Sequence, residues 1–288
     1  MKKIMALTLG ALLFVPSIFL FSACGKNPPK PLEVWDGTYV EISEKVNNTI
    51  KIDTAEELAS FAKSVNEGNS YEGVKIELTC DMDMNNRNWT PIGYGYATYV
   101  SENETQIVGK PFNGIFEGNN HTISNLNVVG RNGGSYGSAG VGLFGFVQGL
   151  VRNLKIKNAV VTGNQYVGVI AGHVANYDST LFGEIKNCHV VDSAVNCVYV
   201  DGTEHGGKAG AIAGQVAAGV VTNCSAKDVT VKANRDAGQL IGNVVRVEGK
   251  DVSTGNTANN VSVSWNQSGG SSENSNTNIK NDLIGKES

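Results

Sequence analysis

The chain has 288 residues, with 23 Lys and Arg against 27 Asp and Glu and a formal net charge of −4. That balance leaves no broad basic surface for phosphates, so we expect no nucleic-acid partner. Gly accounts for 35 residues, above the roughly 7% of average proteins, and only 17% of residues are charged, which together favour a β-rich protein with many tight turns.

Residues 1–23 are typical of an export signal. Two lysines precede an apolar run, and Ser22-Ala23-Cys24 follows it. Small residues before a single cysteine resemble a bacterial lipoprotein signal, and the resemblance implies cleavage before Cys24 and acylation of that cysteine. Residues 24–33 would then be a lipidated, Pro-rich tether, and we expect an exported chain anchored in a bacterial cell envelope, at the cell surface or the periplasmic face. An ordinary cleaved signal peptide with an incidental cysteine is the alternative.

Residues 34–111 are expected to form an N-terminal cap region around one helix, residues 54–67. Thr54 and Glu57 have the spacing of a capping box, and Gly68 follows the last helical turn. Four apolar residues share one face of this helix: Leu58, Phe61, Ala62 and Val65. We expect the helix to cap the N-terminal end of the repeats that follow, because uncovered strand edges would pair with other chains.

An aromatic stretch lies near the end of the cap region, with Trp89, Tyr94, Tyr96 and Tyr99 close together around two glycines. Glycine-spaced tyrosines on a loop offer flat apolar area with a polar tip, which suits sugar rings or a protein partner. These four residues are the candidate surface binding site. The alternative is packing, with Trp89 closing the first coil of the repeats and the tyrosines lying over it.

Residues 112–265 contain two phrases that recur in alternation. One is Gly-x-x-x-Gly, at 168–172, 210–214 and 238–242. The other has the form apolar-x-Asn-apolar-x-apolar, and its asparagines are Asn125, Asn153, Asn187 and Asn223, with a degenerate copy at Asn259. Repetition of this kind predicts a solenoid, and the alternation of apolar and polar residues predicts strands. We expect an all-β fold, a right-handed parallel β-helix (β-solenoid) of about five coils, in which the five asparagines stack as a corner ladder.

Two cysteines of the repeats fall in one predicted column. Cys188 and Cys224 directly follow their marker asparagines, so we expect them on adjacent coils about 4.8 Å apart. That spacing is within disulfide range, but parallel side chains make poor bridge geometry. We expect a buried pair of thiols, with a disulfide as the alternative.

Catalytic and metal-binding motifs are weak. No Cys-x-x-Cys pair, His-Glu-x-x-His helix, phosphate-binding loop or nucleophile elbow occurs. Asp192 and Asp228 share a predicted corner column, where paired carboxylates would suit glycoside chemistry, although aspartates also suit such turns. We expect no enzyme activity, no cofactor and no metal site. Residues 266–288 are a low-complexity tail.

The repeats resemble the GLUG-motif family of bacterial cell-surface proteins. The resemblance rests on Gly-Leu-Phe-Gly at 142–145, the Gly-x-x-x-Gly units, and Trp-Thr-Pro-Ile-Gly at 89–93 before Phe-Asn-Gly-Ile-Phe-Glu-Gly at 112–118. Members of that family form β-helical stalks in adhesin-like proteins and in some large zinc peptidases. The resemblance implies an adhesin-like lipoprotein, whereas the peptidase role does not carry over because the zinc motif is missing.

Together these observations suggest adhesion or surface scaffolding through the outer faces of the solenoid. We expect a monomer that is held to the membrane through Cys24 and that binds a glycan or a host or matrix protein. A carbohydrate-binding or carbohydrate-active β-helix module is the alternative, and a passive structural spacer is the second alternative.

Overall fold

The computed structural model describes residues 32–101, 104–130, 140–175, 183–198, 207–245, 253–265 and 284–287. The predicted signal peptide, Cys24 and residues 24–31 of the predicted tether lie outside these ranges, as do residues 266–283 and 288 of the predicted tail. Within the described ranges, no helix is both long and apolar enough to cross a membrane.

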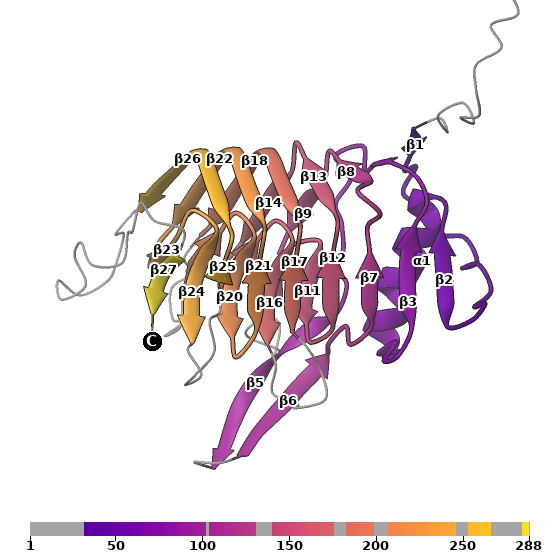
Figure 1. The fold of residues 1–288 in the computed structure, drawn as a ribbon, viewed down its shortest axis with the longest axis horizontal. Coiled ribbons are helices and arrows are strands. Elements are labelled where there is room, and N and C mark those ends of the chain that lie inside the picture. The colour runs from indigo at the N-terminus through magenta and orange to yellow at the C-terminus, as the bar shows by residue number, and fades with distance from the viewer. Residues whose placement is uncertain are drawn as a thin grey trace, which may run out of the picture. The chain divides into compact units, whose positions relative to one another are not determined.

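Parallel strands lie side by side in successive layers along the described chain (Figure 1), and they build four sheets. The first sheet contains β2 (Thr49–Ile52), β3 (Lys75–Leu78), β7 (Ile115–Glu117), β12 (Leu150–Arg152), β17 (Glu184–Lys186), β21 (Val220–Thr222) and β25 (Ser253–Thr254). The second contains β1 (Glu33–Val34), β4 (Met82–Asp83), β8 (Thr122–Ser124), β9 (Asn127–Val129), β13 (Lys155–Lys157), β14 (Val160–Gly163), β18 (His189–Cys197), β22 (Ser225–Ala233) and β26 (Thr257–Trp265).

The third sheet contains β10 (Gly140–Val141), β15 (Tyr166–Gly168), β19 (Lys208–Gly210) and β23 (Asp236–Ala237). The fourth contains β11 (Phe144–Val147), β16 (Ala171–Ala175), β20 (Ala213–Ala217), β24 (Ile241–Val245) and β27 (Ile284–Glu287). Between β7 and β24 the chain passes through the four sheets in the same order on each turn, as from β12 through β13, β14 and β15 to β16. This is the all-β, parallel β-helical architecture that the repeats predict.

The core consists of apolar columns that run from one turn to the next. In the first sheet Phe116, Val151, Ile185 and Val221 are in register and fully buried. In the second sheet Ile123, Ile156, Val190 and Ala226 form an equivalent column. Burial of each larger aliphatic or aromatic side chain contributes about 1.5–3 kcal/mol, so every turn stabilises its neighbours through these columns.

The Gly-x-x-x-Gly phrase brings the third and fourth sheets into direct backbone contact. A Cβ atom added to Gly172 would lie 2.1 Å from the backbone N of Val141 and 2.2 Å from Cα of Gly140. No side chain fits in that space, so the phrase marks a position where two strands meet through their main chains.

Two corners of each turn use residues in the left-handed region of backbone space. The corner between the first and second sheets holds Asn153, Asn187, Asn223 and Gly255, and the corner inside the second sheet holds Asn125, Asn158, Asp192, Asp228 and Asn260. Their φ angles lie between 51° and 66°. Asn and Asp reach this region more readily than other residues with a side chain, which explains their recurrence.

The prediction of one five-membered asparagine ladder is wrong at Asn125 and Asn259. Asn125 belongs to the other corner, where its Oδ1 accepts a hydrogen bond from Asn158 Nδ2 at 3.4 Å. The two corners were confused because residues 118–121 separate β7 from β8, whereas only residues 153–154 separate β12 from β13. Asn259 pairs with Lys227 inside β26, and Gly255 takes the place next to Asn223.

The remaining three asparagines, Asn153, Asn187 and Asn223, do share one column. Asn187 Nδ2 donates to Asn153 Oδ1 at 3.1 Å, and Asn153 Nδ2 donates to Glu117 Oε1 at 2.9 Å. The amides therefore link successive turns at this corner.

The stack extends beyond the predicted boundaries of 112 and 265. β3 pairs with β7 and β4 pairs with β8, so residues 75–83 already belong to the parallel sheets and not to a separate cap region. At the other end, β27 pairs with β24 although residues 284–287 fall in the predicted low-complexity tail. At the N-terminal end the strands keep the apolar positions of the columns that they join, with Ile76 in register with Phe116 and Met82 with Ile123.

The helix predicted over residues 54–67 is α1 (Ala55–Glu67), which connects β2 to β3. Thr54 Oγ1 accepts from the backbone N of Glu57 at 3.1 Å, and Glu57 Oε2 accepts from the backbone N of Asp53 at 2.6 Å. Gly68, with φ of 120°, ends the helix. The buried face of α1 packs Phe61 against Phe112 and Phe116, with ring centroids 5.7 and 6.2 Å apart.

Replacing Asn187 separates the two reasons for its presence at the corner. Asn187→Ala loses the amide bond to Asn153 and places an ordinary side chain in the left-handed region, for a combined loss of about 2 kcal/mol in unfolding free energy. Asn187→Gly loses only the hydrogen bond, so we expect a smaller loss of about 1 kcal/mol. Urea unfolding of both variants measures the difference, and equal losses would contradict the role of backbone conformation.

Candidate functional site

Trp89 is buried, contrary to the prediction that it forms part of a surface binding site. Its side chain is only 2% exposed, and its indole Nε1 donates to the carbonyl of Leu143 at 3.1 Å. The ring meets Trp35 edge to face, with centroids 5.6 Å apart and planes at 74°. Trp89 therefore follows the packing alternative.

The predicted tyrosine loop is a strand. Tyr94, Tyr96 and Tyr99 lie on β5 (Tyr94–Ser101), which pairs antiparallel with β6 (Glu104–Lys110) in a hairpin that projects from the stack (Figure 1). At its base Gly95 faces Gly109, and a Cβ on Gly109 would lie 2.3 Å from the carbonyl O of Tyr94. Tyr94 is half-buried, and the side chains of Tyr96 and Tyr99 lie outside the described residues.

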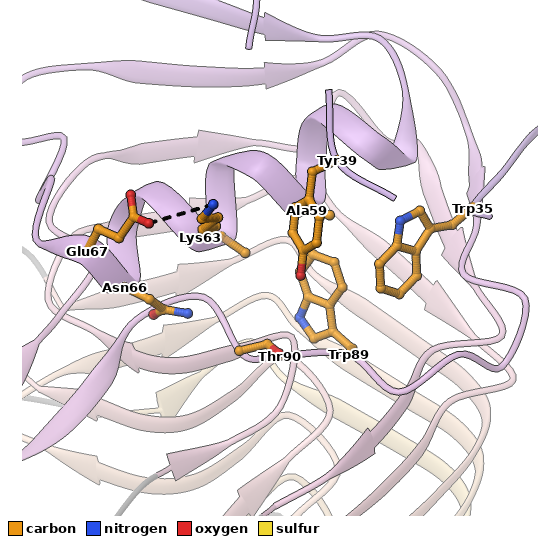
Figure 2. A pocket seen from close by; sticks show the side chains of 9 residues that line it. Trp35, Tyr39, Ala59, Lys63, Asn66, Glu67, Trp89 and Thr90 are labelled. Atoms are coloured by element: carbon orange, nitrogen blue, oxygen red, sulfur yellow. Dashed lines mark ion pairs between the residues drawn. The ribbon is translucent and has the colours of Figure 1, made fainter. Parts of the chain in front are cut away.

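A pocket of about 210 Å³ lies at the N-terminal end of the stack, beside α1 (Figure 2). Three segments form it: residues 35–39, one face of α1, and residues 89–90. The lining residues are Trp35, Tyr39, Ala59, Ala62, Lys63, Asn66, Glu67, Trp89 and Thr90. The interior is thus aromatic and aliphatic, and polar groups stand around it.

Hydrogen bonds fix the walls of this pocket. Asn66, from the last turn of α1, donates through Nδ2 to the carbonyl of Pro91 at 3.0 Å and accepts through Oδ1 from the backbone N of Gly93 at 2.9 Å. This amide holds the helix against the segment that carries Trp89 and leads into the hairpin. The bonds are made by the backbone of 91–93, so they set the position of that segment and do not depend on its side chains.

The segment 35–39 is tied down in the same way. Trp35 Nε1 donates to the carbonyl of Thr38 at 3.0 Å, and Asp36 Oδ1 accepts from both Oγ1 and N of Thr38. These bonds from Thr38, the hydroxyl first, hold the pKa of Asp36 below its usual value. The backbone N of Asp36 also donates to Glu56 Oε1 at 3.2 Å, which joins the segment to α1.

The rim of the pocket carries one charge of each sign. Lys63 Nζ lies 3.8 Å from Glu67 Oε1 and 5.9 Å from the centroid of the Tyr39 ring. Both charged side chains are more than 60% exposed, and Tyr39 is 55% exposed. Sequence reasoning missed Trp35 and Tyr39, although the aromatic Trp-Asp-Gly-Thr-Tyr segment directly after the tether was a usable signal.

A second group of side chains lies along the third and fourth sheets. Phe146, His173, Gln215 and Asn243 occupy equivalent places in the fourth sheet, and Tyr166, Lys208 and Asp236 do so in the third. Lys208 Nζ and Gln215 Nε2 both donate to Asn243 Oδ1, at 3.3 and 3.1 Å. The four residues of the fourth-sheet column are all buried.

His173 is stacked inside this group. Its ring lies parallel to that of Phe146, with centroids 4.7 Å apart, and at 5.3 Å from that of Tyr166. Burial, with the Lys208 charge as the smaller cause, lowers the pKa of His173 to about 3. The imidazole is therefore neutral at every pH at which the protein is expected to work.

The predicted corner column of Asp192 and Asp228 is occupied by turn interactions. Both residues have positive φ angles, and Asp228 Oδ1 accepts from Asn260 Nδ2 at 2.6 Å. Asp192 Oδ2 lies 3.7 Å from Lys157 Nζ. The geometry of the backbone accounts for both carboxylates.

Cys188 and Cys224 are adjacent free thiols, and both are buried. The backbone N of Cys188 donates to Sγ of Cys224 at 3.4 Å, and burial raises the pKa of the Cys188 thiol. The pair therefore forms part of the core column, as the thiol interpretation predicts.

Comparison with known proteins gives limited similarity. No family model matches the chain. Halomucin of Haloquadratum walsbyi is 34% identical over 116 residues, which are 39% of this chain and 1% of halomucin, so the similarity concerns a very small part of that protein. A solved structure from Bacteroides ovatus, described as a putative immunoglobulin A1 protease, is similar with a TM-score of 0.41 and 18% identity, over 83% of this chain and 84% of the other.

Because His173 is buried and neutral, we expect the protein to lose unfolding free energy in acid. Because its pKa is lowered on folding, the unfolded chain binds the proton first, and stability present above about pH 6.5 is lost as the pH falls towards 3. His173→Gln, which places the residue of the next turn in the column, removes this dependence. Between pH 6.5 and 4.5 we expect the unmodified protein to lose about 2–3 kcal/mol more than the variant, as measured by urea unfolding at each pH.

His189→Gln is the matched control for this measurement. Burial, and then Lys155, also lowers the pKa of His189, but that side chain is more exposed, so its replacement should change the pH dependence much less. A larger effect from His189→Gln than from His173→Gln would contradict the assignment.

Proposed function

We propose that this chain is a lipid-anchored β-solenoid of the cell envelope that acts by adhesion or surface scaffolding. The observation that carries the proposal is the β5–β6 hairpin. It leaves the stack after Ile92, which bridges to Phe144, and returns at Phe112, which bridges to Val147. In the described chain its strands pair only with each other, so the insertion adds no pairing to the parallel sheets and is better explained by recognition.

The proposed architecture is a right-handed solenoid of about five coils that belongs with the GLUG-motif surface proteins. The repeated order of the four sheets supports it. We propose that α1 caps its N-terminal end. The packing of Phe61 on Phe112 and Phe116 supports this role, since it buries apolar side chains near the N-terminal end of the stack.

The proposed anchor is the acylated Cys24, and the Pro-rich residues that follow it would hold the solenoid away from the membrane. We propose a monomer that uses no cofactor, has no enzyme activity, and binds a glycan or a host or matrix protein. The tyrosine-bearing strand β5 supports this view over that of a passive spacer, because tyrosines are enriched at recognition surfaces.

The hairpin tyrosines test the adhesion proposal. Tyr94, Tyr96 and Tyr99 changed together to Ala should abolish saturable binding of the protein without residues 1–24 to an array of glycans and matrix proteins. The matched control is Thr98→Ala with Thr105→Ala, which alters the same hairpin without removing an aromatic ring. Binding that survives the tyrosine changes would overturn the role of the hairpin, and new reducing or unsaturated sugar ends would contradict a non-enzymatic protein.

Replacement of Cys24 tests the anchor. Cys24→Ala should prevent incorporation of labelled fatty acid and move the protein from the membrane fraction to the soluble exported fraction, because acylation needs the thiol. Cys80→Ala, which removes a buried thiol from the folded domain, should leave labelling unchanged. Membrane association that persists in Cys24→Ala would show that another element holds the protein.

A further inference from the structure

We propose that the pocket beside α1 is a binding site for one neutral sugar ring, such as the terminal pyranose of a glycan. It lies between Trp35, Tyr39 and Trp89 on one side and Lys63, Glu67 and Thr90 on the other (Figure 2). This site is separate from the hairpin tyrosines, and the inference does not depend on their role.

The aromatic walls provide a hydrophobic surface. Trp35 and Trp89 are packed in the core, 5% and 2% exposed, and form the floor of the pocket. Both indole N–H groups donate to backbone carbonyls, those of Thr38 and Leu143, so the small part of each ring that reaches the pocket is carbon surface. Tyr39 adds a ring that is 55% exposed at the entrance. A pyranose has an apolar face of C–H groups that packs on such rings, as do other flat ligands with an apolar face.

The polar rim provides both donors and acceptors of hydrogen bonds. The ammonium of Lys63 donates, the carboxylate of Glu67 accepts, and the hydroxyl of Thr90 does both. Such groups placed around an apolar interior fix the orientation of a small ligand.

Charge decides between neutral and anionic sugars. Lys63 and Glu67 lie 3.8 Å apart, so the positive charge is already balanced at the rim. An acidic sugar would meet the Glu67 carboxylate as well as the Lys63 ammonium, and it would gain little from the pair. The balance therefore favours a neutral ring.

Size limits the ligand to one ring. The pocket measures about 210 Å³, below the range of roughly 300–1,000 Å³ that is usual for drug-sized ligands. The walls cannot easily widen, because Asn66 fixes α1 to the backbone at residues 91 and 93. The site is thus preformed for a monosaccharide unit.

Titration with methyl glycosides of neutral hexoses and N-acetylhexosamines, followed by tryptophan fluorescence and by calorimetry, tests the proposal on the protein without residues 1–24. We expect saturable binding of at least one neutral glycoside in the millimolar range. Tyr39→Ala should weaken it about tenfold, the upper end of what one stacked ring contributes. Glu67→Gln should also weaken it, because the amide replaces one acceptor oxygen by a donor.

Two controls separate this site from the hairpin and from other ligands. The variant with Tyr94, Tyr96 and Tyr99 changed to Ala should bind the glycoside with unchanged affinity. Val40→Ala, next to Tyr39 and 45% exposed, should do the same. The proposal is overturned if no neutral glycoside binds, if Tyr39→Ala leaves the affinity unchanged, or if only uronic acids, sialic acid or aromatic peptides bind.

Discussion

The constraint on which the structure depends is in-register stacking of parallel strands. Each residue of a turn lies next to its equivalent in the turns before and after, about 4.8 Å away. An inward position must therefore stay apolar in every turn, as in the column from Phe116 to Val221, and a corner position must tolerate the left-handed backbone in every turn. The asparagines and the Gly-x-x-x-Gly phrase are consequences of this constraint, which is why they recur in the chain.

The same constraint explains what could be predicted. Periodic features of the sequence were visible, and they correctly indicated parallel strands and Asn-rich corners. The error at Asn125 arose because both corners prefer the same residue type, so a local phrase cannot tell them apart. Only the number of residues between strands distinguishes them, and that number becomes visible when β7 and β8 are seen to pair with β12 and β13.

The periodicity of the sequence does not predict the candidate site. Its walls come from residues 35–39, from α1 and from residues 89–90, three segments that share no repeat and meet only after folding. Helix α1 was predictable because a capping box and an apolar face are local signals. The contact between Trp35 and Trp89 was not predictable, because neither segment carries a local signal that identifies the other as its neighbour. The strands β3 and β4 were missed for a related reason, since the turn that they open is interrupted by the hairpin.

The pocket and the hairpin lie near the N-terminal end of the stack, where the stacking constraint acts from one side only. A residue in the middle of the stack has neighbours on both sides, so a substitution there must be accommodated by two other turns. His173 is an example, because it stacks on Phe146 and is in register with Gln215. The first turn has a repeat on one side only, and α1 with its preceding segment covers the other. Side chains there can differ from those of the repeats without breaking a column. The rigid stack supplies the support, and the N-terminal end is where the fold leaves most freedom for aromatic and charged side chains to form a site.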